Sequence, residues 1–248
     1  DFSGRTGIYG ARQRLIRSIM KLTSTVCLGL IVSLTGCSQL GGGTQTQSQT
    51  MSAAHASCGK AVDADTSMNL DLIEQLMTSG RLHAALAHLD NLQSTSPYAT
   101  YLRAEILRQS DRNQEAAEYY LSLLQTCMVG EAHHGLGLIA GRKNLLNKAV
   151  EHLTVAAEQL PVNARIRNDL GYALLLQGHF EKAQHEFISA LELDQDARLA
   201  ETNMMILLLA TGEQSKAEAF ARRINMDPQT VADLNEQAMS IRAQTRSR

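Results

Sequence analysis

Residues 165–194 read RIRNDLGYALLLQGHFEKAQHEFISALELD, and this stretch decides the fold. Small residues recur in it at Gly171, Ala183 and Ala190, with leucine and phenylalanine side chains between them. Because glycine and alanine have almost no side chain, helices that meet at these positions can approach to the short end of the ~8–10 Å range. Gly178 lies where the first helix would end, since glycine adopts the left-handed backbone conformation easily. The stretch therefore predicts two closely packed antiparallel helices.

The order of these residues resembles the tetratricopeptide repeat, a hairpin of two helices in about 34 residues. One such hairpin cannot bury its own apolar face, so the resemblance implies neighbouring copies. One repeat length before Gly171 and Ala183 lie Gly137 and Ala149, which have the same small side chains. Weaker copies lie further out in both directions. We therefore expect repeat units over residues 66–96, 97–129, 130–163, 164–197 and 198–227.

The composition also favours helices packed on helices. The 248-residue chain has 4% aromatic residues, no tryptophan and 3 prolines. Leucine and alanine must then form most of the interior, which suits helices rather than a sheet. We predict an all-α fold, namely a right-handed α-solenoid of about five tetratricopeptide (TPR) helix hairpins in a domain over residues 66–227. A C-terminal capping helix and tail over 228–248 should follow, with an apolar face formed by Val231, Leu234, Ala238 and Ile241.

The residues before the repeats have the pattern of an export signal. We expect residues 1–19 to be an over-extended N-terminus, with translation beginning at Met20. Lys21 then supplies the positive charge that precedes a short apolar run, Val26–Leu34. This run is too short to span a bilayer. We predict a signal peptide over residues 20–36.

The end of this signal, Leu34–Cys37, resembles the lipobox of bacterial lipoproteins. The resemblance implies cleavage before Cys37 and acylation of that cysteine, which anchors the protein in a membrane. Since Ser38 rather than an aspartate follows, it further implies the outer membrane, with the protein facing the periplasm. Residues 37–65 are rich in Gly, Thr, Gln and Ser and should form the lipidated start of a flexible tether. The alternative is an ordinary signal peptide with an unmodified cysteine.

Two further cysteines, Cys58 and Cys127, remain outside the signal. In an oxidising compartment they can form a disulfide, which would connect the tether to the second repeat unit. The alternative is two free thiols, one in the tether and one at a helix end.

The candidate binding site comes from the resemblance to tetratricopeptide proteins, in which the first helices line a concave groove. The positions that face the groove in that family include, in this sequence, Tyr98, Tyr101, Glu105, Arg108, Glu131, His134, Leu138, Arg165, Asn168, Tyr172 and Leu175. Tyrosine and arginine are enriched at binding hot spots, so we predict a surface for a bound helix or extended peptide. The alternative is a solvated inner face, with the partner on an edge or on the convex side.

The sequence contains no motif for a reaction or a cofactor. A glycine-rich phosphate loop, HExxH, CxxC and G-x-S-x-G are all absent, so we predict neither an enzyme nor a cofactor site. The formal net charge of −2 gives no reason to expect nucleic acid. His133 and His134 point about 100° apart on a helix, so we do not expect this adjacent pair to bind a metal. We interpret the apolar run Met204–Leu209 as repeat core, with a hydrophobic contact site as the alternative.

The chain resembles the pilotin lipoproteins of Gram-negative bacteria in three features. These are the lipobox, the short polar tether and the repeats, which include the stretch Asn168–Leu175. Within that class they are similar to the lipoprotein of the tight-adherence (Tad, Flp) pilus system. The resemblance implies a protein partner, an outer-membrane secretin subunit, whose insertion and multimerisation the lipoprotein promotes. A hydrophobic secretin segment would lie in the groove while the acyl chains on Cys37 direct the pair to the membrane. The alternative function is a scaffold for other outer-membrane biogenesis factors or cell-wall enzymes.

Overall fold

The computed structural model describes residues 58, 64–194 and 198–246. Predictions for the N-terminus, the signal peptide, Cys37 and most of the tether fall outside these residues. The described part of the chain is helical and contains no strand, so the predicted all-α class is confirmed. Within the same residues, every helix is too short or too polar to cross a bilayer.

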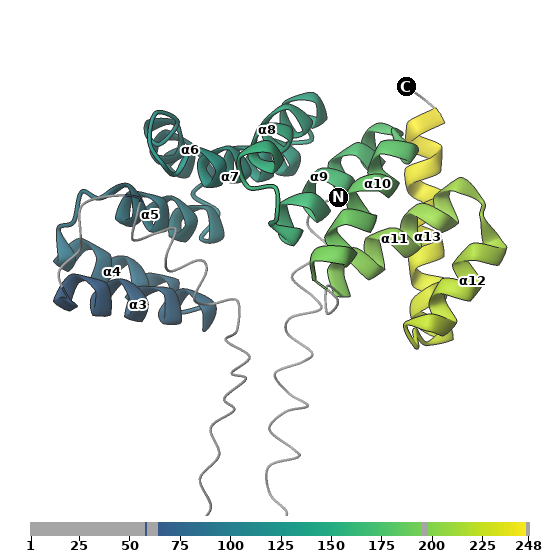
Figure 1. Cartoon of the computed structure of the whole chain (residues 1–248), viewed down its shortest axis with the longest axis horizontal. Helices are drawn as coiled ribbons and strands as arrows, with labels where there is room; N and C mark the ends of the chain where they lie inside the picture. The colour runs from purple at the N-terminus through teal and green to yellow at the C-terminus, as the bar shows by residue number, and fades with distance from the viewer. Residues whose placement is uncertain (1–57, 59–63, 195–197, 247–248) are drawn as a thin grey trace, which may run out of the picture. The chain divides into compact units, whose positions relative to one another are not determined.

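The helices follow one another as hairpins (Figure 1). The five pairs are α3 (Ala64–Thr78) with α4 (Leu82–Leu92), α5 (Pro97–Gln109) with α6 (Asn113–Ser122), α7 (Val129–Arg142) with α8 (Leu146–Gln159), α9 (Ala164–Gln177) with α10 (Phe180–Leu193), and α11 (Arg198–Thr211) with α12 (Gln214–Arg223). A last helix, α13 (Pro228–Arg246), follows the fifth pair. This is the predicted succession of five hairpins and one C-terminal helix.

Each hairpin turns through one residue in the left-handed conformation. Glycine or a short polar residue stands at this position in all five turns: Gly80, Asp111, Asn144, Gly178 and Gly212. The next backbone N–H then donates back to the last turn of the first helix, as from His179 to the Leu174 carbonyl at 3.0 Å. This is the hydrogen bond of a Schellman cap, and it ends the first helix at the same place in every repeat.

The two helices of a hairpin touch at small residues. A Cβ atom added to Gly171 would lie 2.7 Å from Cδ1 of Phe187, and one added to Gly137 would lie 2.7 Å from Cγ of Leu153. Both distances are shorter than a van der Waals contact, so only glycine allows this approach. The matching alanines of the second helices are completely buried: Ala149 and Ala183. The small side chains therefore do lie at the helix contacts.

The first helices of successive hairpins also contact one another, from α3 through α5, α7 and α9 to α11. We call the exposed side of these five helices the first-helix face. Two clusters of buried residues lie beneath it, one from α3 to α7 and the other from α7 to α13. The third hairpin thus joins the two parts of the core.

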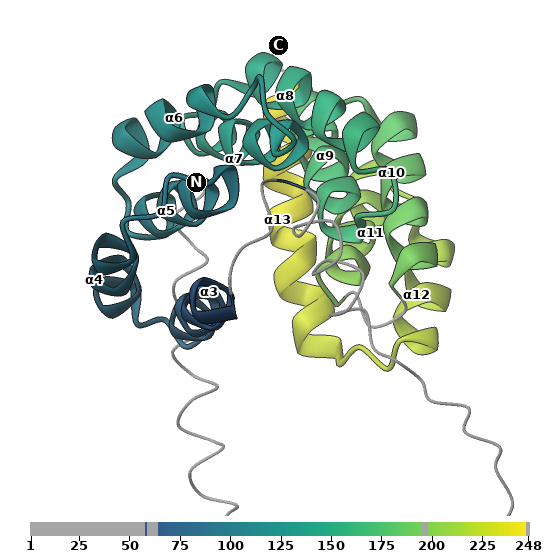
Figure 2. The same cartoon turned by 60° about the vertical axis from the view of Figure 1, so that its left-hand side comes forward.

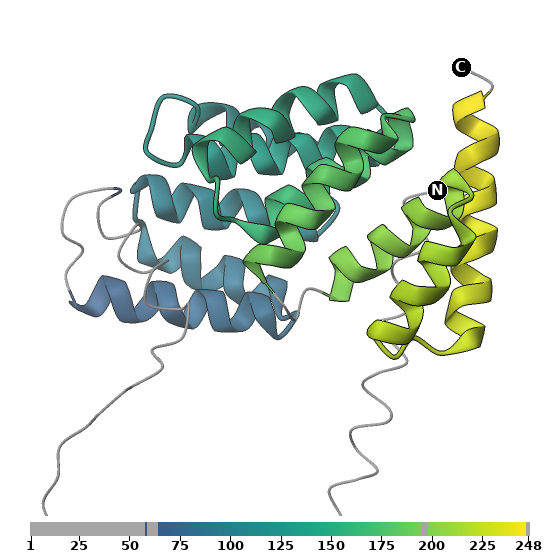
Figure 3. The same ribbon diagram turned by 45° about the vertical axis from the view of Figure 1, so that its right-hand side comes forward.

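Helix α13 packs mainly against α11 and also contacts α9. Figures 2 and 3 show it, in yellow, alongside the helices of the last hairpin. It begins at a cap in which the N–H of Thr230 donates to Oδ1 of Asp227 at 2.9 Å. The buried side of α13 consists of Leu234, Ala238 and Ile241. Because α9 and α11 are both first helices, α13 covers the last part of the first-helix face.

This position of α13 explains the unusually apolar sequence of α11. Residues 203–210 of α11 are all buried, although one repeat needs only part of them for its own core. The remainder is covered by α13 of the same chain. The alternative interpretation of Met204–Leu209 as an external contact site is therefore wrong, and the run belongs to the core.

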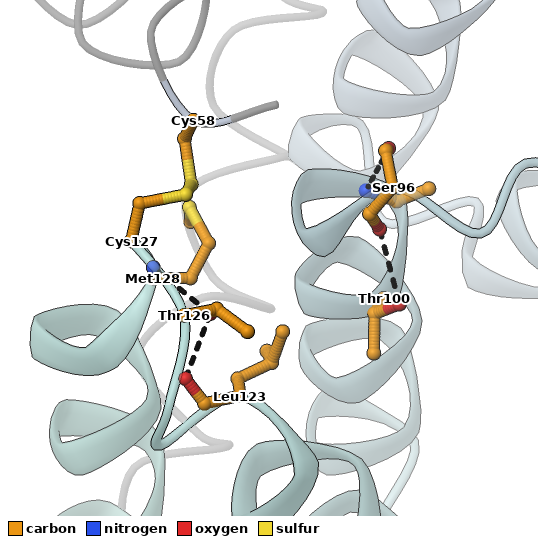
Figure 4. Close-up of a disulfide and its surroundings, with 8 residues drawn as sticks. Cys58, Ser96, Thr100, Leu123, Thr126, Cys127 and Met128 are labelled. Atoms are coloured by element: carbon orange, nitrogen blue, oxygen red, sulfur yellow. Dashed lines mark hydrogen bonds between the residues drawn. A yellow bond between two sulfur atoms is a disulfide. The ribbon is translucent and has the colours of Figure 1, made fainter. Parts of the chain in front are cut away.

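Cys58 and Cys127 are joined by a disulfide, with their Cα atoms 5.3 Å apart (Figure 4). Cys127 lies in the loop between α6 and α7. The hydroxyl of Thr126 orders this loop, because it donates to the Leu123 carbonyl at 2.7 Å and accepts from the N–H of Met128 at 3.1 Å. The bond therefore fixes the chain ahead of α3 to the end of the second hairpin.

Candidate protein-binding site

Two of the predicted groove tyrosines lie together on α5. The rings of Tyr98 and Tyr101 stack with their centroids 6.1 Å apart. Tyr98 is buried, and its hydroxyl donates to the Glu74 carboxylate on α3. Burial, followed by this hydrogen bond and the charge of Glu74, raises the pKa of Tyr98 above its usual value. Tyr98 thus links two first helices, whereas Tyr101 remains partly exposed.

Glu105 is buried, with 6% of its surface exposed, and it lies at the centre of a hydrogen-bond network. Its carboxylate accepts from Nη2 of Arg108 at 2.8 Å, from Nε2 of Gln109 at 3.2 Å and from the hydroxyl of Tyr120. Burial alone would raise the pKa of Glu105, but the charge of Arg108 and these hydrogen bonds outweigh it and lower the pKa to about 2. The carboxylate is therefore occupied within the protein and does not face a partner.

The network should make the fold sensitive to acid. The pKa of Glu105 is about 2 in the folded protein against 4.5 for the free side chain, so its contribution to stability is present above pH 4.5 and is lost as the pH falls towards 2. We expect a loss of about 2 kcal/mol between pH 6 and pH 3 that Glu105→Gln does not show. Denaturant unfolding at several pH values measures it. Glu118→Gln on the exposed side of α6 is the matched control and should behave as the wild type. Parallel pH profiles for wild type and Glu105→Gln would show that other groups cause the acid sensitivity.

A line of polar side chains crosses the first helices of the third, fourth and fifth hairpins. Nε2 of His134 lies 2.9 Å from Oδ2 of Asp169, and Nδ2 of Asn168 donates to Oδ1 of Asp169 at 3.3 Å. Nδ2 of Asn203 donates in turn to Oδ1 of Asn168 at 2.8 Å. Both asparagines are buried, and leaving such a group unpaired costs about 1–3 kcal/mol. This line therefore fixes how α7, α9 and α11 align.

The predicted groove residues thus divide into two sets. The side chains that are buried in the fold are Tyr98, Glu105, Asn168 and Leu175. Those that keep some exposure are Tyr101, Arg108, Glu131, His134, Leu138, Arg165 and Tyr172. The first set is buried because successive first helices lie in close contact. The repeat pattern alone does not predict how closely they approach.

Three residues of the exposed set lie on the first helices of three successive hairpins, namely Tyr101 on α5, Glu131 on α7 and Arg165 on α9. Burial and the charge of Glu105 raise the pKa of Tyr101; the charge of Arg165 opposes this effect and that of Glu131 adds to it. The charged groups of Glu131 on α7 and Arg165 on α9 are therefore near enough to influence the Tyr101 hydroxyl electrostatically. We call Tyr101, Glu131 and Arg165, together with the partly exposed Arg108 and Leu138, the open first-helix site.

The open first-helix site ends where α13 begins to cover the face. Nε2 of Gln237 on α13 donates to the hydroxyl of Tyr172 on α9 at 3.4 Å. Tyr172 is therefore in contact with the protein's own C-terminal helix. A partner that binds the first helices meets α5, α7 and the start of α9 rather than α11.

Sequence reasoning did not single out Tyr120, Asp169 or Asn203. Tyr120 fits the repeat pattern as an ordinary core residue, yet a Cβ atom added to Gly135 would lie 2.2 Å from its ring. Asn203 stands between Thr202 and the apolar run Met204–Leu209, so its neighbours indicate burial on one side only. Its partner Asn168 occupies a similar place one repeat earlier.

Five helical hairpins that expose part of their first helices define a TPR protein. The chain belongs to the TPR repeat-containing proteins, because it is 37% identical over 183 residues, or 74% of each chain, to the TPR repeat-containing protein PA4299 of Pseudomonas aeruginosa. No family model matches it. The function that this membership supports is protein–protein interaction.

Solved structures of similar fold include PilF of Pseudomonas aeruginosa, with a TM-score of 0.60, 16% identity, and coverage of 75% of this chain and 89% of that one. MamA of Desulfovibrio magneticus RS-1 has a TM-score of 0.52, 16% identity, and coverage of 71% and 98%. At such identities the likeness concerns the fold alone.

Proposed function

We propose that this protein is a lipid-anchored periplasmic adaptor that binds a secretin subunit while a tight-adherence pilus or a related secretion machine is assembled. Membership of the TPR repeat-containing proteins supports the protein-binding role. The lipobox-like Leu34–Cys37 supports the anchor in the outer membrane. The single observation that carries the proposal is the open first-helix site, to which Tyr101, Glu131 and Arg165 contribute exposed surface from the first helices of three successive hairpins.

In this proposal a helix or extended segment of the secretin lies across α5, α7 and the start of α9. Tyr101 and Leu138 offer apolar surface to it, and tyrosines of this kind commonly dominate binding energy. Arg165 and Glu131 carry opposite charges, so they favour one orientation of the bound segment over its reverse. The acyl chains on Cys37 then keep the complex at the membrane in which the secretin multimerises.

The anchor is tested by Cys37→Ser in cells. We expect loss of secretin multimers from the outer-membrane fraction and loss of pili, because the adaptor no longer reaches the membrane. Cys27→Ser, which changes a cysteine within the predicted signal, is the matched control and should leave both intact. Normal secretin rings in cells that lack this protein would contradict the proposal. Co-purification of cell-wall enzymes instead of a secretin would favour the scaffold role.

A further inference from the structure

Two histidines face each other across the third hairpin. Nδ1 of His133 on α7 lies 2.9 Å from Nδ1 of His152 on α8, and the ring centroids are 5.1 Å apart with 45° between the ring planes. Both side chains are partly buried. His134, the sequence neighbour of His133, contacts Asp169 instead. The pair therefore joins two helices and is distinct from the open first-helix site.

We propose that His133 and His152 form a binding site for a divalent transition-metal ion of the copper or nickel type. A bond from such a metal to an imidazole nitrogen is about 2.0–2.1 Å long. Two ligands at a right angle around the metal are then about 2.9 Å apart, whereas tetrahedral ligands are about 3.3–3.4 Å apart. The observed separation of 2.9 Å already equals that of two ligands at a right angle. The centroid separation of 5.1 Å shows that the two nitrogens now point at each other, so both rings must tilt to direct their lone pairs at one ion. Tetragonal coordination of this kind by nitrogen and oxygen is typical of Cu²⁺ and Ni²⁺.

The surroundings of the pair favour the form that binds metal. Burial, followed by repulsion from the other ring, lowers the pKa of His133, and burial also lowers the pKa of His152. The negative charge of Glu151 opposes this lowering of the pKa at both rings, and the positive charge of Lys148 adds to the lowering at His152. A neutral imidazole is the form that donates a lone pair to a metal.

Without metal, one Nδ1–H donates to the other Nδ1, so the two rings share one hydrogen bond. Binding requires this proton to move to Nε2 of the same ring, which leaves both Nδ1 lone pairs for the ion. The ring stays neutral and no proton is released. Among the described residues no group of three or more His, Cys, Asp or Glu side chains surrounds a common point. Water or a donor from a partner must therefore complete the coordination.

An ion at this position would connect α7 to α8 in the hairpin where the two core clusters meet. It would also hold in place the helix that carries Glu131 and Leu138 of the open first-helix site. We therefore expect metal binding to stabilise the third hairpin in particular.

The test uses the full chain without an affinity tag, stripped with a chelator and with its free thiols alkylated. On titration with Cu²⁺, we expect an electron paramagnetic resonance spectrum with coupling to two ring nitrogens, and a rise of a few degrees in the melting temperature. His133→Gln and His152→Gln should each lose the coupling to one nitrogen and bind Cu²⁺ at least about tenfold more weakly. His185→Gln, which removes an exposed histidine of α10, is the matched control and should behave as the wild type.

The same spectrum and the same rise in melting temperature in the His133→Gln/His152→Gln double variant would overturn the proposal. Failure of the wild type to bind Cu²⁺ or Ni²⁺ would overturn it equally. Neither result touches the secretin-binding proposal, because the pair lies outside the open first-helix site.

Discussion

Removal of the disulfide, by Cys58→Ser/Cys127→Ser or by reduction, is expected to lower the free energy of unfolding by about 4 kcal/mol. The bond closes a loop with a sequence separation of 69 residues, which contains the first two hairpins. A crosslink over such a loop restricts the unfolded chain strongly, and the chain-entropy relation gives the quoted magnitude. Urea unfolding of the wild type with and without reductant measures the difference.

The double serine variant provides the control for reduction, since reductant should no longer change its stability. The loss should also be local, because each repeat depends mainly on its neighbours. We expect faster hydrogen exchange in α3–α6 than in the wild type, with little change in α9–α12. Equal stability of the oxidised and reduced wild-type protein would contradict this account of the bond.

Phe187→Ala is expected to cost about 4 kcal/mol, because the fourth hairpin closes around this ring. Phe187 is completely buried, and its ring fills the space that the absent side chain of Gly171 leaves. Alanine would leave a cavity between α9 and α10 that the rigid helix contact cannot close. Thermal and denaturant unfolding both report the loss.

The next residue along the chain supplies the matched control. Ile188 is 43% exposed, so Ile188→Ala should change stability by no more than about 0.5 kcal/mol. Similar losses in Phe187→Ala and Ile188→Ala would mean that the contact between Gly171 and Phe187 does not define the hairpin.

The sequence predicted the hairpins well because their signals are local. Small residues such as Gly137 and Gly171 report where helices touch, and a glycine such as Gly178 reports where the first helix must turn. Both kinds of residue recur at almost constant spacing. The class and the order of the helices could therefore be predicted without knowledge of distant contacts.

The candidate site could be predicted only in part, because burial depends on contacts between repeats. Glu105 and Asn168 occupy groove positions by spacing, yet close approach of neighbouring helices buries both. The apolar α11 carried a signal for an additional contact, but not the identity of the segment that covers it. The pairing of His133 with His152 depends on how two helices are rotated, which spacing within one helix does not specify.

The central claim is that a secretin segment binds the open first-helix site. A photo-reactive residue placed in cells at Glu131 or Arg165, followed by irradiation and mass spectrometry, tests it most directly. Glu118 on α6 and Glu158 on α8 are exposed positions on second helices and serve as controls. The account predicts secretin peptides crosslinked from Glu131 and Arg165 and none from Glu118 or Glu158. Secretin crosslinks from the second-helix positions alone, or from none of the four, would contradict it.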